Sequence, residues 1–131
     1  MILVDTNVFV DVIYTDPIWL AWSLRALSNA KQAQIVTNFV VYAELHTHNT
    51  AGPHIDAFLE KLGVRMLDVS RPAAQLAAQA FRGYRQRGGT KSGVLPDFFI
   101  GAHALVEGHT LLTRDAGRYR TYFPGIQLIC P

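Results

Sequence analysis

Short apolar runs alternate along this chain with longer segments in which apolar residues recur at helical spacing. Residues 2–4 read Ile-Leu-Val and are followed at once by Asp5, which is typical of a short buried strand. Similar runs at 34–37, 64–69, 110–113 and 126–129 predict further strands. Ala77, Ala80, Phe81 and Tyr84 occupy positions i, i+3, i+4 and i+7, as on one face of a helix. Strands that alternate with helices predict an α/β protein whose mostly parallel sheet is covered on both faces.

Residues that favour helix ends mark where the predicted helices begin and stop. Asp16 before Pro17 is typical of a helix start, and Leu20, Leu24 and Leu27 then fall on one face. Further helices are expected after Asn38 (with Val41, Glu44 and Leu45), over 54–62 before Gly63, after Ser70 and Pro72, and from Pro96 to Gly108. The glycine-rich stretch 87–93 is expected to form a flexible loop.

Composition narrows the class of protein. The chain has 131 residues, of which half are hydrophobic and 17% are charged, as expected for one compact domain spanning 1–131. Cys130 is the single cysteine and cannot form an internal disulfide, which favours a reducing, cytoplasmic setting. The start lacks the basic residues of a signal peptide, and no apolar run reaches the length of a membrane span, so we expect no membrane association.

Four acidic residues fall at places where a parallel sheet presents its ligand-binding edge. Asp5 ends the first predicted strand, and Asp115 lies two residues after the fourth. Glu44 lies about two turns into the helix after the second strand, and Asp97 lies in the first turn of the helix before the fourth. Ligands of such sheets bind outside the carboxyl ends of the strands. Each acid alone has a structural explanation, as a helix cap or turn residue; together they indicate a site. Whether Asp97 reaches the same edge is an inference.

Acidic side chains that converge need a reason to coexist. Two unit charges 4 Å apart repel by about 4 kcal/mol at an effective dielectric constant near 20. Either a shared proton or a cation must relieve that repulsion. A site made of carboxylates suits a hard ion such as Mg²⁺ or Mn²⁺. The chemistry that best matches such a site is in-line hydrolysis of a phosphodiester.

The same residues form four motifs in a recognisable order. They are Ile2-Leu3-Val4-Asp5-Thr6-Asn7-Val8, Ala43-Glu44-Leu45, Pro96-Asp97-Phe98-Phe99-Ile100-Gly101-Ala102 and Leu111-Leu112-Thr113-Arg114-Asp115. In order, spacing and total length the chain resembles the PIN domain, in particular the VapC-type toxins of toxin–antitoxin pairs. Phe98 and Phe99 depart from the pattern, because smaller aliphatic residues are common after that aspartate. The resemblance spans nearly the whole chain.

The resemblance implies a three-layer αβα sandwich around a five-stranded sheet. It also implies an RNA endonuclease that uses one or two Mg²⁺ or Mn²⁺ ions. By motif position, Asp5 and Asp97 would be the principal metal ligands, and Glu44 and Asp115 would complete the catalytic site. The further implied roles are support by hydrogen bonds for Asn7 and Thr113, and a structural role for Asp11. Such toxins usually form homodimers and are silenced by an antitoxin peptide that enters the acidic groove.

Basic residues gather in the second half of the chain. From Arg82 to Arg120 there are seven basic and three acidic residues, although the formal net charge of the chain is only +2. Such a distribution is compatible with a nucleic-acid-binding surface or with a solvated helix face followed by a basic turn, and the acidic cluster favours the first interpretation. We therefore expect Arg87, Lys91 and Arg114 to contact RNA. Tyr84 and Tyr119 lie among these cations and are candidates for stacking on unpaired bases, although packing in the core is the favoured interpretation of Tyr84.

Other functions remain open from the residues alone. His46 and His48 can be read as a metal pair, or as the acid and base of a metal-independent cleavage that leaves a cyclic phosphate. A phospho-receiver domain would need adjacent acids after the first strand, where Thr6 follows Asp5. A phosphatase of the haloacid-dehalogenase type would need an acid at Asn7. A catalytically silent PIN domain that only binds RNA or a protein is the remaining alternative.

Overall fold

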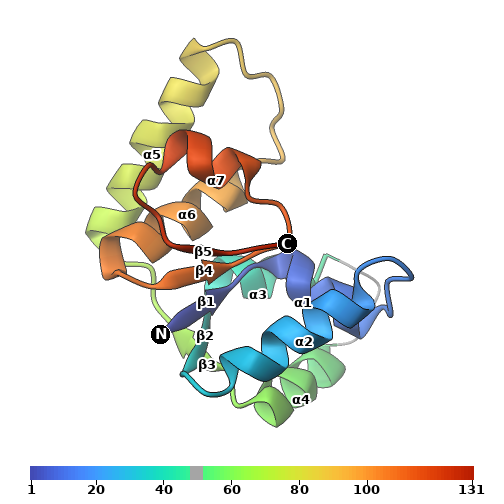
Figure 1. Ribbon diagram of the computed structural model, residues 1–131. Helices are drawn as coiled ribbons and strands as arrows, with labels where there is room; N and C mark the ends of the chain where they lie inside the picture. Colours follow the sequence, from blue (N-terminus) through green and yellow to red (C-terminus); the bar gives the residue numbers. More distant parts are fainter. Residues whose placement is uncertain (48–51) are drawn as a thin grey trace.

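A parallel sheet runs through the middle of the molecule (Figure 1). The computed structural model describes residues 1–47 and 52–131, and within them the sheet has five strands in the order β3-β2-β1-β4-β5. Its strands are β1 (Ile2–Val4), β2 (Ile35–Asn38), β3 (Arg65–Leu67), β4 (Thr110–Leu112) and β5 (Leu128–Ile129). Every pairing is parallel, with Ile2 in register with Ile35 on one side and Thr110 on the other. The predicted α/β class is confirmed.

Helices cover the sheet on two sides. They are α1 (Thr6–Ile13), α2 (Leu20–Ala30), α3 (Phe39–Leu45), α4 (Gly52–Leu62), α5 (Arg71–Gln86), α6 (Leu95–Glu107) and α7 (Gly117–Tyr122). In Figure 1, α1, α2 and α4 gather on one side, and α5, α6 and α7 on the other. This division follows from right-handed crossovers, because the chain moves from β1 to β3 in one direction and returns past β1 to β4 and β5.

The predicted caps account for several helix ends. Asn38 Oδ1 accepts a 3.0 Å hydrogen bond from Val41 N, and Ser70 Oγ accepts one of 3.3 Å from Ala73 N. Asp16 Oδ1 caps a turn through Ile18 N and Trp19 N, both at 2.8 Å, and the regular helix α2 begins at Leu20. These caps satisfy backbone N–H groups that the first helical turn leaves without partners.

Two helices were not predicted from the pattern of apolar positions. Helix α1 follows β1 directly, and its β-branched residues favour strand over helix when they are considered alone. Helix α7 has six residues, too few for an apolar period to show. The expected inward face of α2 is wrong in one position, because Leu24 is 48% exposed and Ser23 is buried instead. Ser23 packs inward because its hydroxyl donates a 2.8 Å hydrogen bond to the buried Asp11 carboxylate.

The core lies between the sheet and the two helix layers. Leu3, Val4, Leu111 and Leu112 of the central strands are fully buried. Burial on both faces explains why these strands read as continuous apolar runs rather than as alternating patterns. In the described part of the chain, no helix combines the length and hydropathy needed to span a bilayer.

Candidate active site

The candidate site lies where the strand order reverses beside β1. The chain leaves β1 into Asp5 and leaves β4 into Thr113, and Asp5 N donates a 2.9 Å hydrogen bond to Leu112 O. The connections after these two neighbouring strands run to opposite sides of the sheet, which opens a crevice at their carboxyl ends. This order also differs from the 2-1-3-4-5 order of receiver-type sheets, which removes the phospho-receiver alternative at the level of topology.

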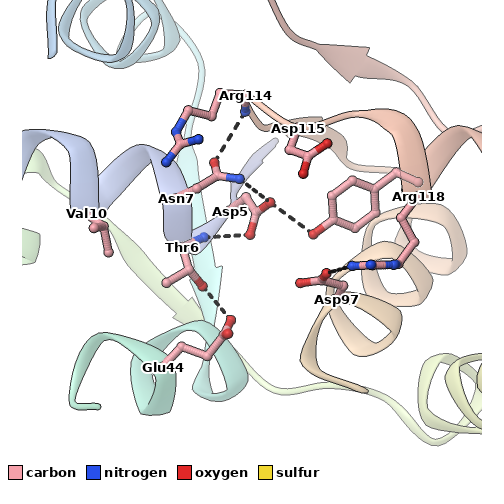
Figure 2. Close-up of a pocket in the computed structure, with 10 residues that line it drawn as sticks. Asp5, Thr6, Asn7, Val10, Glu44, Asp97, Arg114, Asp115 and Arg118 are labelled. Carbon is pink, nitrogen blue, oxygen red and sulfur yellow. Dashed lines mark hydrogen bonds and ion pairs between the residues drawn. The ribbon is translucent and has the colours of Figure 1, made fainter. Parts of the chain in front are cut away.

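All four predicted acids line one pocket at this crevice (Figure 2). The pocket has a volume of about 260 Å³, room for several water molecules beside an ion. Its lining residues are Asp5, Thr6, Asn7, Val10, Glu44, Asp97, Arg114, Asp115, Arg118 and Tyr119. Asp97 therefore does reach the edge that carries Asp5, a placement that sequence alone did not determine. Helix α6 is held in this position because it packs against both α5 and α3.

Asp5 is held by hydrogen bonds on both of its carboxylate oxygens. Oδ1 accepts from Thr6 N at 2.7 Å. Oδ2 accepts from Thr113 Oγ1 at 2.8 Å, from Tyr119 OH at 3.0 Å and from Asn7 Nδ2 at 3.1 Å. Asn7 and Thr113, the residues expected to support the acids, thus lie in contact with Asp5. Donors from the start of α1, from the residue after β4 and from α7 fix the orientation of this carboxylate.

Burial decides the protonation behaviour of Asp5. The side chain is 4% exposed, and loss of solvation raises its pKa from 3.8 to about 6. The hydrogen bond from Thr113 lowers this pKa, the negative charge of Asp97 raises it, and the bonds from Tyr119 and Thr6 lower it. A carboxylate with a raised pKa beside another acid gains from a nearby cation.

Glu44 and Asp115 enter the pocket from opposite sides. Asn38 ends β2 and caps α3, which carries Glu44, and Thr6 Oγ1 donates a 2.6 Å hydrogen bond to Glu44 Oε1. Asp115 follows β4 and is exposed; its backbone N donates a 3.1 Å hydrogen bond to Thr113 Oγ1. Thr6 is a lining residue that the sequence analysis did not single out.

Asp97 pairs with a residue that the sequence analysis counted only as part of the basic half. Arg118 Nη1 contacts Asp97 Oδ2 in an ion pair, shown by a dashed line in Figure 2. Burial raises the pKa of Asp97, Arg118 lowers it through charge and hydrogen bonding, and Asp115 raises it. Arg118 could have been identified from the sequence by its position, because it is a basic residue only three positions after Asp115.

The side chains that line the pocket are of the types that bind a divalent cation, although they do not yet lie in the geometry of a metal site. The four carboxylates that line this pocket supply the oxygen ligands that Mg²⁺ and Mn²⁺ prefer. Among the residues that the structure describes, however, no three acidic, histidine or cysteine side chains already meet in the geometry of a metal site. Positive charge reaches the acids instead through the Arg118–Asp97 ion pair.

The three predicted RNA contacts lie in different places. Arg114 lines the pocket, but its Nε pairs at 2.9 Å with Asp11, whose carboxylate is fully buried. The structural role expected for Asp11 agrees with this contact. Arg87 and Lys91 are exposed and lie outside the residues that line the pocket.

The expected stacking role of Tyr119 is wrong. Its side chain is 2% exposed and its hydroxyl is bonded to Asp5, so no base can stack on the ring. Tyr84 packs among Phe81, Phe98 and Tyr122, with ring centroids 5.6 to 6.0 Å apart. Both rings are structural parts of the fold.

The histidines give no support to a second mechanism at this pocket. His46 Nδ1 lies 2.7 Å from Tyr42 O, whereas His48 is outside the described residues. His103 and His109 are buried, and their rings make an edge contact with centroids 5.6 Å apart. Within residues 1–47 and 52–131, no histidine lines the acidic pocket.

Comparison with solved structures agrees with this architecture. The VapBC2 complex of Rickettsia felis, bound to promoter DNA, matches with a TM-score of 0.76 at 21% identity, covering 100% of this chain and 99% of that chain. FitAcB from Neisseria gonorrhoeae gives 0.71 at 23%, with 98% and 96% covered. A toxin–antitoxin complex from Klebsiella pneumoniae gives 0.69 at 21%, again with 98% and 96% covered. At these identities the similarity is one of fold.

Sequence comparison supplies the family. No curated protein sequence matches the chain. The model of the PIN domain matches residues 2–124, a span that contains all four acids of the pocket. The chain therefore belongs to the PIN-domain family.

Proposed function

We propose that this protein is a metal-dependent endoribonuclease and the toxin of a toxin–antitoxin pair. The observation that carries the proposal is the pocket at the end of β1 and β4, where Asp5, Glu44, Asp97 and Asp115 come together from four separate parts of the chain. Crowding of acids in a partly buried pocket costs free energy of folding. A reaction that requires a cation in this pocket would explain why the protein keeps the four acids together despite that cost.

In this proposal Asp5 and Asp97 are the principal ligands of Mg²⁺ or Mn²⁺, and Glu44 and Asp115 complete the site. A bound divalent cation supplies the positive charge that offsets the charge of a phosphodiester during hydrolysis. The protein's part is to keep the ligands in place. Donors on both oxygens hold Asp5 in one orientation, and Thr6 orients Glu44 in the same way.

The partners follow from the family and from the surface. The solved relative from Klebsiella pneumoniae is a toxin–antitoxin complex, and we propose a basic antitoxin segment that binds over the acidic pocket. Beside the pocket, an apolar groove is lined by Phe39, Val40, Ala43, Glu44, Thr47, Leu95, Pro96 and Phe99. Phe39 is 54% exposed and Leu95 37% exposed. Exposed apolar surface of this kind marks interfaces, and we assign it to a second copy of the chain in a homodimer.

Cleavage of purified RNA tests the activity. We expect cleavage with Mg²⁺ or Mn²⁺, none with EDTA, and a loss of about a hundredfold or more in Asp97→Asn. Asp68→Asn is the matched control, because Asp68 lies after β3 and outside the pocket lining. Products with a 5′-phosphate and a 3′-hydroxyl support metal hydrolysis. Cleavage that persists in EDTA and in Asp97→Asn, or a cyclic phosphate product, contradicts the proposal, and RNA binding without cleavage identifies a silent PIN domain.

A further inference from the structure

Two consecutive residues of α7 contact the two principal acids. Arg118 pairs with Asp97, and Tyr119 donates its hydroxyl to Asp5. At Gly101 of α6, an added Cβ would lie 2.4 Å from Phe123 Cε2 and 3.0 Å from Tyr119 Cδ1, so the absence of a side chain lets these two rings pack against α6. Close approach of α6 and α7 at this glycine therefore brings Arg118 to the pocket.

We infer that Arg118 is a built-in counter-cation for Asp97, which a divalent cation displaces, and that the released guanidinium then binds a phosphate of the RNA. This inference rests on the proposed function, because it assigns a partner and a sequence of events to the same site. Arg118 would not bind the metal; its side chain would move from Asp97 to an RNA phosphate.

Competition for Asp97 follows from charge and space. Mg²⁺ binds oxygen ligands at about 2.0 to 2.1 Å, while Arg118 Nη1 is in direct contact with Oδ2 of Asp97. Two positive charges a few ångströms apart repel each other, and the repulsion doubles when one of them is divalent. The divalent ion and the Arg118 guanidinium therefore compete for the Asp97 carboxylate, and binding of one weakens binding of the other.

The exposure of the pair makes the exchange feasible. The Arg118 side chain is 28% exposed and the Asp97 side chain 30%, so water reaches both partners. An ion pair exposed to this degree contributes less stability than a fully buried one, and opening it leaves the Asp97 carboxylate in contact with solvent. The Arg114–Asp11 pair is different, because Asp11 is fully buried and loss of its arginine would leave the Asp11 carboxylate without a counter-charge in the protein interior. Of the two arginines that line the pocket in the described residues, Arg118 is the exchangeable one.

The released side chain would meet a suitable ligand in a phosphate of the bound RNA. A guanidinium binds phosphate oxygens through two parallel N–H donors, a geometry that matches a phosphodiester. Arg118 lies on α7 directly before the buried Tyr119, and its side chain already lines the pocket, so it need not leave the pocket when it releases Asp97. Loss of the metal would return it to Asp97.

Binding of Mn²⁺, measured by calorimetry at about pH 7.5, tests the competition. We expect Arg118→Gln to bind Mn²⁺ about threefold or more tightly than the wild type, and Arg118→Lys to stay near the wild type because it keeps the charge. Arg120→Gln is the control, since Arg120 is an exposed residue of the same helix whose guanidinium contacts Cys130 Sγ at 3.2 Å. Unchanged or weaker binding by folded Arg118→Gln overturns the inference while the proposed function stands.

A second measurement covers phosphate binding and needs no cleavage. The affinity for a short single-stranded RNA is followed by fluorescence anisotropy in Ca²⁺ over a range of salt concentrations. Arg118→Gln is expected to lower the slope of log affinity against log salt by about 0.7, the value of one lost phosphate contact. An unchanged slope contradicts the second half of the inference.

The wild-type protein provides a test that does not depend on the folding of a variant. Nuclear magnetic resonance of the arginine Nε–H groups is expected to show that Mg²⁺ moves the Arg118 signal and leaves the Arg120 signal in place. An Arg118 signal that stays in place while Mg²⁺ binds overturns the exchange. If neither the wild type nor Arg118→Gln binds Mn²⁺ or Mg²⁺, the proposed function fails and the inference fails with it.

Discussion

The Tyr119 hydroxyl donates a 3.0 Å hydrogen bond to Oδ2 of Asp5, joining a short helix near the C-terminus to the end of the first strand. Both side chains are nearly inaccessible, at 2% and 4% exposure. Burial and the nearby acids raise the pKa of Tyr119 well above its usual value, so the hydroxyl remains a donor. The buried Tyr119 therefore helps to orient the Asp5 carboxylate, and its hydrogen bond lowers the pKa of Asp5.

Tyr119→Phe removes this donor without changing the shape of the core. Because the Tyr119 hydrogen bond lowers the pKa of Asp5, its loss raises that pKa further above 6. We expect the acidic limb of the pH–activity profile to move to higher pH, and unfolding free energy to fall by about 1 kcal/mol. Tyr122→Phe, on the same helix and outside the pocket lining, is the control. Equal profiles for both variants would show that the hydroxyl has no influence on the site.

Asp5 should also make stability depend on pH in an unusual direction. Its pKa is about 6 in the folded protein and near 3.8 in the unfolded chain, so the folded state holds the proton more tightly. Its contribution to stability is then greatest below about pH 4 and is lost as the pH rises through about 6, by on the order of 3 kcal/mol.

Urea denaturation of the wild type and Asp5→Asn from about pH 4 to about pH 7 isolates this contribution. The asparagine does not titrate, so any fixed cost of the substitution cancels in the pH dependence. The unfolding free energy of the wild type minus that of the variant is expected to decrease across this interval. A difference that stays constant or increases would contradict the raised pKa.

Gly101→Ala tests the close approach of α6 and α7. The added Cβ would lie 2.4 Å from Phe123 Cε2, so we expect a loss of about 1 to 3 kcal/mol in unfolding free energy and reduced RNA cleavage as α7 shifts. Gly83→Ala in α5 is the matched control, because among the described residues no atom lies within 4 Å of the added Cβ. That change is expected to stabilise the helix by up to about 1 kcal/mol. Similar effects of both changes would show that contact at Gly101 is unimportant.

Phe39→Ser tests the proposed interface between two copies. Phe39 begins α3, is 54% exposed and lines the apolar groove, so its loss is expected to weaken the homodimer. Ile18→Ser is the control, since Ile18 is 79% exposed and lies outside that groove. Analytical ultracentrifugation measures the mass of each variant. A wild type that sediments as a monomer at all concentrations would remove the homodimer from the proposal.

Local signals were sufficient for much of the fold. The apolar run before Asp5 predicts β1, and the caps at Asn38 and Ser70 predict the starts of α3 and α5, because each depends on residues only a few positions apart. Helices α1 and α7 escaped prediction since one is rich in β-branched residues and the other is a single short segment. Packing against their neighbours stabilises both helices where intrinsic propensity does not.

Local patterns in the sequence were enough to place Asp5 and Asp115 after strand ends, and the order of the four motifs was enough to indicate the PIN family. The folded arrangement was needed to establish that Asp97 shares a pocket with Asp5, that Arg118 pairs with Asp97, and that Tyr119 is buried against Asp5. The reason is physical: strand and helix signals act over a few residues, whereas a side chain's partners depend on how α6 and α7 pack across the sheet. The raised pKa of Asp5 also depends on the folded structure, because burial is its main cause.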